Sequence, residues 1–311
     1  MQSIKDGHIL DFDEEKHRYT LDGNRVPGST TFGKGGYPTS EQLIGWKVAQ
    51  GSIYTAAMIQ RLRREKPNRV IGGEVLAAIV KRSKKASEKV SKRAAGIGTI
   101  VHDYAYLTEL GRTREALQML SEHENHPDWQ KINNGVKKYE EWHSQNKGDT
   151  VLLEAIVASV VHQFGGKFDH LSIRNGLLIL SDYKTSTGIY VDMFIQLASY
   201  AIAIEEWLDK WFAEYKLPLK VGGLEILRFG KEDGEDFQPL LITDPQEIEE
   251  LKAQAIRCRD TYRFRLRWEN DKRFKYMGGA SGTKSSGATP KSGLKRISRK
   301  QRDKDSASQV G

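Results

Sequence analysis

Residues Gly165–Lys184, which read GGKFDHLSIRNGLLILSDYK, decide the fold of this chain. Asn175-Gly176 near the middle is typical of the two-residue type I′ turn that joins the strands of a β-hairpin. Apolar and β-branched residues on both sides of the turn predict one strand before it and one after it. Because the turn fixes the register of a hairpin, counting outward from it places Asp169 opposite Asp182.

Two opposed aspartates are unusual in a purely structural sheet. Directly opposed residues have Cβ atoms roughly 4.5–5.5 Å apart, and like charges at that distance repel. A divalent cation between Asp169 and Asp182 would convert the repulsion into binding. Lys184 lies two residues beyond Asp182 and therefore points to the same face of the sheet. Two acids that hold Mg²⁺ or Mn²⁺, with a cation beside a phosphate, are the groups that phosphodiester hydrolysis needs.

Glu154 is a further candidate on the strand before the hairpin. If His162-Gln163 is the connecting turn, Glu154 faces Leu171, on the same face of the sheet as Asp169. It could then be an additional metal ligand or a partner for Lys184. An ordinary exposed strand glutamate is the alternative that the sequence leaves open.

Three side chains on expected helices complete the candidate site. His102 follows Gly96-Ile97-Gly98 at the expected start of a helix, where an imidazole could complete the shell of ligands around a metal ion. Gln196 and Tyr200 are four residues apart after the hairpin, so they share one helix face and could reach a phosphate together. Taken alone, each has a better ordinary explanation: a core or surface histidine for His102, and helix packing for Gln196 and Tyr200.

The remaining pattern predicts a mixed α/β protein. We expect a short hairpin of extended segments 17–21 and 25–31 around Asp22-Gly23-Asn24, helices between 39 and 146, strands at 151–161, 165–173 and 177–184, a helix at 189–212, a strand at 223–229 and a helix at 245–267.

Basic residues give the 311-residue chain a net charge of +8, and they gather in two segments. Residues 61–93 have helical spacing and include Lys81, Arg82, Lys84 and Lys85, which we expect to follow a DNA backbone. Residues 278–311 hold Gly, Ser, Lys and Arg with almost no apolar residues, which predicts a disordered basic tail. A solvated helix face and a solubility tail are the alternatives.

Composition also excludes several classes of site. Cys258 is the only cysteine, so this chain alone forms no disulfide, no cysteine-ligated zinc site and no iron–sulfur cluster. No apolar run is long enough to span a membrane, and residues 1–10 are too polar for a secretory signal. We therefore expect no membrane partner and a cytoplasmic location, which would be the host cytoplasm if the protein is phage-encoded.

Five short motifs occur in order between Gly96 and Tyr200: Gly98-x-x-x-His102, Glu154, Gly166-x-x-Asp169, Asp182-Tyr183-Lys184 and Gln196-x-x-x-Tyr200. In this order the chain resembles a PD-(D/E)XK nuclease of the RecB-like branch. The opening residues 17–31 are similar to those of phage-encoded members and of the mitochondrial genome maintenance exonuclease. Members with an iron–sulfur cluster hold it with four cysteines, from which this chain departs.

This resemblance implies a restriction-endonuclease-like fold, with a mixed central sheet flanked by helices and a helical N-terminal insertion. One nuclease domain would cover 1–277, with a basic helical segment at 39–146 and a catalytic core at 96–267. The resemblance implies the following roles: His102, Asp169, Asp182 and the Tyr183 carbonyl bind the metal, Lys184 activates water, and Gln196 and Tyr200 hold DNA.

The function implied is a metal-dependent DNA exonuclease in phage or bacterial recombination, repair or DNA degradation. The sequence has no phosphate-binding G-x-x-x-x-G-K-[ST] loop, so any unwinding, single-strand-binding or recombination partner would be a separate protein. An endonuclease with the same metal site, structure-specific or of restriction type, and a catalytically inactive DNA-binding protein of the same fold are the alternatives.

Overall fold

The computed structural model describes residues 2–3, 7–68, 70–146, 148–208, 220–269 and 271. Residues 1–267 form one compact unit. The strands are β1 (Gln2–Ser3), β2 (Ile9–Asp13), β3 (Arg18–Leu21), β4 (Asn24–Val26), β5 (Asp149–Ser159), β6 (Phe164–Arg174), β7 (Leu177–Lys184), β8 (Gly223–Arg228) and β9 (Gln238–Ile242). The helices are α1 (Ser29–Gly36), α2 (Glu41–Glu65), α3 (Gly73–Ser83), α4 (Ala86–Glu109), α5 (Thr113–Ser121), α6 (Trp129–Gln145), α7 (Val191–Glu205) and α9 (Pro245–Glu269).

The central sheet has the strand order β5-β6-β7-β8-β9. Strands β7 and β8 are parallel, and the other neighbours are antiparallel, so the sheet is mixed. Helices cover both faces. One core joins α7 to the sheet through residues such as Leu180 and Leu197, and a second joins α4 and α6 to it through Val101, Tyr139 and Tyr183. The expected mixed α/β sheet flanked by helices is therefore confirmed.

The hairpin has the register that the sequence predicts. Asn175 and Gly176 have φ values of 53° and 75°, as a type I′ turn requires, and the ladder runs from Arg174↔Leu177 to His170↔Ser181. The next pair of positions along the two strands is Asp169 and Asp182. The expected bounds of β7 are also those observed.

The connection between β5 and β6 differs from the prediction. The turn has four residues, 160–163, and not the two expected, so Leu152 and not Glu154 pairs with Leu171. A partly buried acid at the end of α7 explains the longer turn, because the Glu206 carboxylate accepts hydrogen bonds from the backbone N–H groups of Val160 and Val161. A slip of two residues keeps each side chain on its face.

The N-terminal region contains a second, four-stranded sheet in the order β1-β2-β3-β4. Asp22 and Gly23 have positive φ and form the predicted turn between β3 and β4. The expectation of extended chain up to residue 31 was wrong, because α1 begins at Ser29 and buries Phe32 completely in the main core. Strands β2 and β9 were not predicted.

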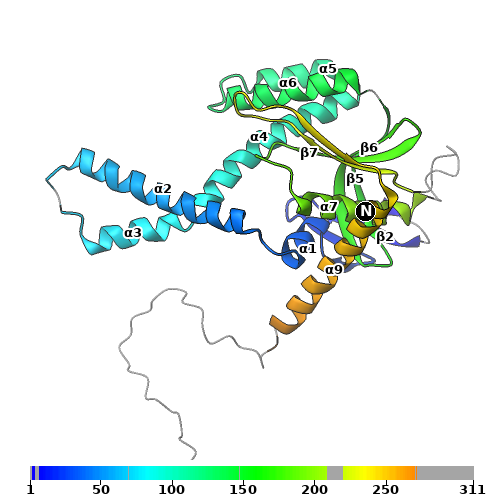
Figure 1. Ribbon diagram of the computed structural model, residues 1–311, viewed down its shortest axis with the longest axis horizontal. Helices are drawn as coiled ribbons and strands as arrows, with labels where there is room; N and C mark the ends of the chain where they lie inside the picture. The colour runs from blue at the N-terminus through cyan, green and yellow to red at the C-terminus, as the bar shows by residue number, and fades with distance from the viewer. Residues whose placement is uncertain are drawn as a thin grey trace, which may run out of the picture. The chain divides into compact units, whose positions relative to one another are not determined.

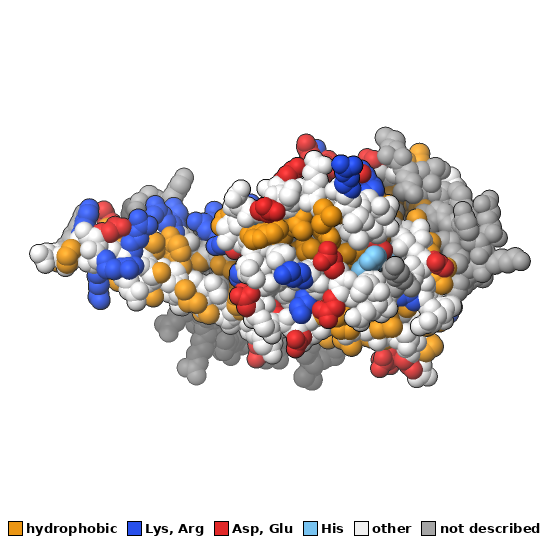
Figure 2. All heavy atoms as spheres, turned by 90° about the horizontal axis from the view of Figure 1, so that it is seen from above, with side chains coloured by type: hydrophobic (Ala, Val, Ile, Leu, Met, Phe, Trp, Pro, Cys, Tyr) orange, Lys and Arg blue, Asp and Glu red, His pale blue; other side chains and the backbone are white. Residues whose placement is uncertain are grey.

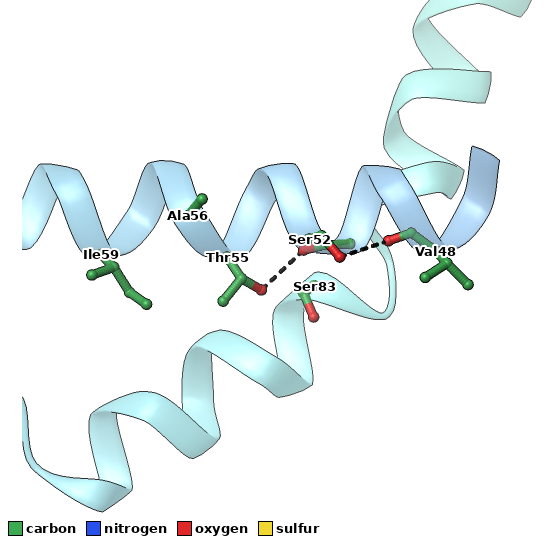
Figure 3. A pocket seen from close by; sticks show the side chains of 7 residues that line it. Val48, Ser52, Thr55, Ala56, Ile59 and Ser83 are labelled. Atoms are coloured by element: carbon green, nitrogen blue, oxygen red, sulfur yellow. Dashed lines mark hydrogen bonds between the residues drawn. The ribbon is translucent and has the colours of Figure 1, made fainter. Parts of the chain in front are cut away.

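Helices α2 and α3 run side by side, and α4 continues from them to the central sheet (Figure 1). A groove between α2 and α3 is lined by small and aliphatic side chains: Val48, Gly51, Ser52, Thr55, Ala56, Ile59 and Ser83 (Figure 3). The lining contains no acidic, basic or histidine side chain, so the groove offers no general acid or base and no charged metal ligand. Lysine, arginine and apolar side chains are interspersed over this part of the surface (Figure 2).

Two expectations fall on segments that the structure does not describe. The domain boundary at 277 and the basic tail 278–311 lie outside the described residues, and so do residues 209–212 at the end of the predicted helix 189–212. Among the helices that are described, none is both long and apolar enough to cross a membrane.

Candidate metal centre

Three potential ligands converge at one edge of the central sheet. His102 from α4, Glu154 from β5 and Asp169 from β6 each offer one nitrogen or oxygen atom, and these three atoms lie within 4.8 Å of one another. All three residues are partly accessible to solvent. Two carboxylates and an imidazole form a donor set that fits a divalent cation, with room for solvent or substrate oxygens in the remaining positions.

His102 lies well inside α4, which is a correction to its expected place at the start of a helix. Gly98, one turn earlier, explains how this helix reaches the site. A Cβ at Gly98 would lie 3.0 Å from Oγ1 of Thr185, directly after β7, so the glycine allows α4 to approach the sheet closely. That approach carries the imidazole to within 3.6 Å of an Asp169 oxygen.

Glu154 has an irregular backbone, and this irregularity places it in the site. It lies between the pairs Leu153↔His170 and Ala155↔Phe168, opposite Asp169, with φ at 47°. Positive φ is costly for a residue with a Cβ, and such strain clusters at functional sites. The prediction that Glu154 faces Leu171 was wrong. The observed register places Glu154 opposite Asp169, closer to it than the predicted register did.

Lys167 is a residue of this site that the sequence reasoning missed. Its ammonium forms an ion pair with Glu154 at 2.7 Å. The available signal was its position two residues before Asp169 on the same strand, because side chains at that spacing share a face. Lys167 therefore compensates the charge of Glu154 and limits its side chain to few conformations.

Asp169 is held in a fixed orientation and in an environment that disfavours its charge. Its Oδ2 atom accepts a hydrogen bond from the backbone N–H of Tyr183 at 2.7 Å. Burial raises the pKa of Asp169; nearby His102 lowers that pKa and the Asp182 carboxylate raises it. A cation at this position would offset the cost of keeping the carboxylate ionised.

Asp182 and Lys184 form a separate pair next to the three-residue cluster. The Lys184 ammonium makes an ion pair with Oδ2 of Asp182, whose side chain is only 5% exposed. Although burial alone would lower the pKa of Lys184, the Asp182 and Asp169 carboxylates outweigh it, and the pKa is raised above its ordinary value. The lysine is thus a cation anchored beside the cluster, and direct ligation by Asp182 stays a prediction.

Tyr183 contributes through its backbone. Its ring is buried in the core beneath α4 and α6, where the hydroxyl and the His170 imidazole form a 3.0 Å hydrogen bond. Both faces of β7 are therefore fixed at this point, with Asp182 on one and Tyr183 on the other. Metal binding by the Tyr183 carbonyl stays a prediction.

Gln196 and Tyr200 share one face of α7, as predicted, but they differ in accessibility. Nε2 of Gln196 donates to the Tyr200 hydroxyl at 2.5 Å, which places the two side chains in contact. Tyr200 is only 2% exposed and packs beneath Gly166. Direct contact with DNA, which was expected of Tyr200, is not available to its side chain in this arrangement, whereas Gln196 is partly accessible.

The four cations that are expected to follow DNA precede all three residues of the cluster in the amino-acid sequence. Lys81 and Arg82 are in the last turn of α3, and Lys84 and Lys85 connect α3 to α4. All four are exposed. Their role in binding DNA stays a prediction.

Comparison with known proteins identifies no family for this chain. No family model matches the chain, and no curated protein matches it either. A crystal structure described as a "putative exonuclease" from Eubacterium rectale is similar over 54% of this chain and 68% of that one, with 15% identity and a TM-score of 0.33. A similarity at this TM-score carries no inference about activity.

Proposed function

We propose that this protein is a metal-dependent nuclease that hydrolyses phosphodiester bonds in DNA. The observation that carries the proposal is the convergence of His102, Glu154 and Asp169 from three different elements, with the Asp182–Lys184 ion pair beside them. A perturbed carboxylate, an imidazole and an anchored cation at one partly accessible place mark a candidate catalytic site.

In this proposal His102, Glu154 and Asp169 hold a Mg²⁺ or Mn²⁺ ion. When bound, the ion supplies Lewis-acid polarisation of a phosphate oxygen and acidifies a water molecule. The Tyr183 N–H keeps Asp169 in its orientation, and the Lys167 ammonium does the same for Glu154. Lys184, held by Asp182, places a positive charge where negative charge develops on the phosphate.

The imidazole favours Mn²⁺ over Mg²⁺ as the better cofactor. Mg²⁺ is bound almost entirely by oxygen, whereas affinity for nitrogen donors rises from Mn²⁺ along the first transition row. We expect the wild type to be inactive in EDTA and active in either ion, with Mn²⁺ effective at the lower concentration. His102→Asp should reverse that preference, as measured by titrating each metal into a single-turnover cleavage assay. An unchanged ratio of the two activating concentrations would exclude His102 from the metal site.

DNA is the proposed substrate because the surface of α3 and the start of α4 is basic. We propose that Lys81, Arg82, Lys84 and Lys85 hold the strand by its phosphates as it enters the site, and that the enzyme acts on the strand from a free end. Incubation of end-labelled linear, nicked and covalently closed circular DNA with Mn²⁺ tests this. Progressive shortening of linear DNA with survival of closed circles is the expected result, and efficient cutting of closed circles would identify an endonuclease.

Removal of the charges of Lys81, Arg82, Lys84 and Lys85 should weaken DNA binding without affecting the chemical step. Each phosphate contact steepens the logarithmic dependence of affinity on salt by roughly 0.9 on duplex DNA, so the Gln variant of all four residues should bind with a shallower salt slope. Cleavage of a short oligonucleotide at saturation should continue at the wild-type rate. Gln substitution of Arg18, Arg25, Arg114 and Lys137, four exposed cations outside residues 61–93, is the matched control. An equal change of the salt slope in the control variant would show that DNA affinity depends on the total positive charge and not on these four positions.

A further inference from the structure

Gln196, Tyr200 and Thr30 form one hydrogen-bonded group, although Thr30 lies far from the other two in the sequence. Nε2 of Gln196 donates to Oγ1 of Thr30 at 3.0 Å and to the Tyr200 hydroxyl at 2.5 Å. The Tyr200 hydroxyl also interacts with the Thr30 side chain, which acts to lower the pKa of Tyr200. Two hydroxyls from different elements therefore meet a single carboxamide.

The backbone on each side of this group is anchored. Thr30 is in the first turn of α1, which is fixed to β6 because the Ser29 hydroxyl donates to the Gly165 carbonyl at 3.2 Å and the Gly165 N–H donates to the Pro27 carbonyl at 3.0 Å. Tyr200 is fixed from below, because its ring fills the space that a side chain at Gly166 would occupy. Neither hydroxyl can move far without a shift of the main chain.

Two anchored hydroxyls are enough to fix the plane of the Gln196 amide. Hydroxyl groups both donate and accept hydrogen bonds, so they satisfy either the nitrogen or the oxygen edge of a carboxamide. In both orientations the opposite edge remains free, and Gln196 is partly accessible while Tyr200 is buried. The group lies beside the strand that carries Asp169, because the Tyr200 ring packs against Gly166, three residues before Asp169 on β6.

We propose that Thr30 is a positioning residue for the substrate: it holds the Gln196 amide so that the free edge of the amide meets the nucleic-acid strand next to the metal centre. This rests on the proposed nuclease function. Loss of the Thr30 hydroxyl removes one of the two contacts that fix the amide, which then samples more rotamers and binds the strand less well. The chemical step does not involve Thr30.

Thr30→Val tests the proposal, because it removes the hydroxyl and keeps the shape of the side chain. One lost hydrogen bond corresponds to an increase in KM for DNA of about threefold to tenfold, and kcat should stay within about twofold. Thr30→Ser should restore the wild-type KM. Thr31→Val, at the next and exposed position of α1, is the matched control and should leave both constants unchanged.

A second readout does not depend on cleavage. In NMR spectra, the side-chain NH₂ protons of Gln196, assigned by comparison with Gln196→Ala, should exchange with solvent faster in Thr30→Val than in the wild type or Thr30→Ser. Unchanged exchange together with unchanged KM would overturn the proposal. If exchange accelerates but the wild type cleaves no nucleic acid, the contact is real and the nuclease function is what fails.

Discussion

Asp169→Asn is expected to lower kcat/KM for DNA cleavage on the order of 10³-fold or more, in Mg²⁺ and in Mn²⁺. The asparagine keeps the size of the side chain and can still accept the Tyr183 N–H, so the β-hairpin should be unchanged. What is lost is the negative charge that His102 and Glu154 need beside them to hold a divalent cation. The measurement is single-turnover cleavage of an end-labelled linear duplex.

The thermal stability of Asp169→Asn should not fall with its activity. Burial and the neighbouring carboxylate of Asp182 disfavour the charge on Asp169, so its removal should leave the thermal midpoint without metal unchanged or higher. Asp103→Asn on α4 is the control, since Asp103 lies next to His102 in sequence but outside the three-residue cluster. Cleavage by Asp169→Asn at the rate of Asp103→Asn would remove Asp169 from the mechanism.

Gly166→Ala should be among the most destabilising single substitutions near the site. A Cβ there would lie 2.3 Å from Cε1 of Tyr200, whose ring is buried and whose hydroxyl is held by Gln196. Overpacking of this kind costs about 1–3 kcal/mol and more where neither side can yield. We expect a loss of about 3 kcal/mol in the free energy of unfolding, as measured by denaturant titration.

Gly96→Ala is the matched comparison, and it should raise the free energy of unfolding instead of lowering it. Among the residues that the structure describes, no atom lies within 4 Å of a Cβ built at this exposed position of α4. Alanine in place of glycine in a helix interior stabilises by roughly 0.5–1 kcal/mol. A stable Gly166→Ala protein with wild-type KM would show that Tyr200 is not fixed beneath β6, and the positioning role of Thr30 would lose its basis.

The parts of the fold predicted well from the sequence are those set by local chemistry. Asn175-Gly176 fixes both the turn and the register of the hairpin, because few dipeptides tolerate two positive φ values in succession. The same local rule identified the turn at Asp22 and Gly23. Periodicity predicted that helices occupy residues 39–146, as observed, but it gave no bounds for the individual helices.

The parts that local chemistry could not predict depend on distant contacts. The turn between β5 and β6 is set by Glu206, more than 40 positions later in the chain, and no pattern near His162 reveals that partner. Helix α1 replaces an expected strand because Phe32 fits the main core. Thr30 meets Gln196 across 166 positions of sequence, so only the folded structure places it beside the site.

In the candidate site, too, some features follow from local sequence rules and others do not. The hairpin register predicted the positions of the two aspartates, and spacing along single elements predicted the faces of Lys184 and Gln196, whereas no such rule predicted the composition of the three-residue cluster. Glu154 joins Asp169 through an irregular residue with positive φ, and Asp182 turns toward Lys184. Spacing rules assume regular strands, so they fail where the backbone departs from regularity.

Binding of Mn²⁺ to the purified protein, followed by electron paramagnetic resonance of the free ion, tests the metal centre most directly. We expect saturable binding by the wild type that is strongly weakened in Asp169→Asn, Glu154→Gln and His102→Ala. Binding should be retained in Asp149→Asn, a substitution at the exposed start of the same strand as Glu154. Binding that is unchanged in all three cluster variants, or absent from a folded wild type at millimolar Mn²⁺, would contradict the proposed metal centre.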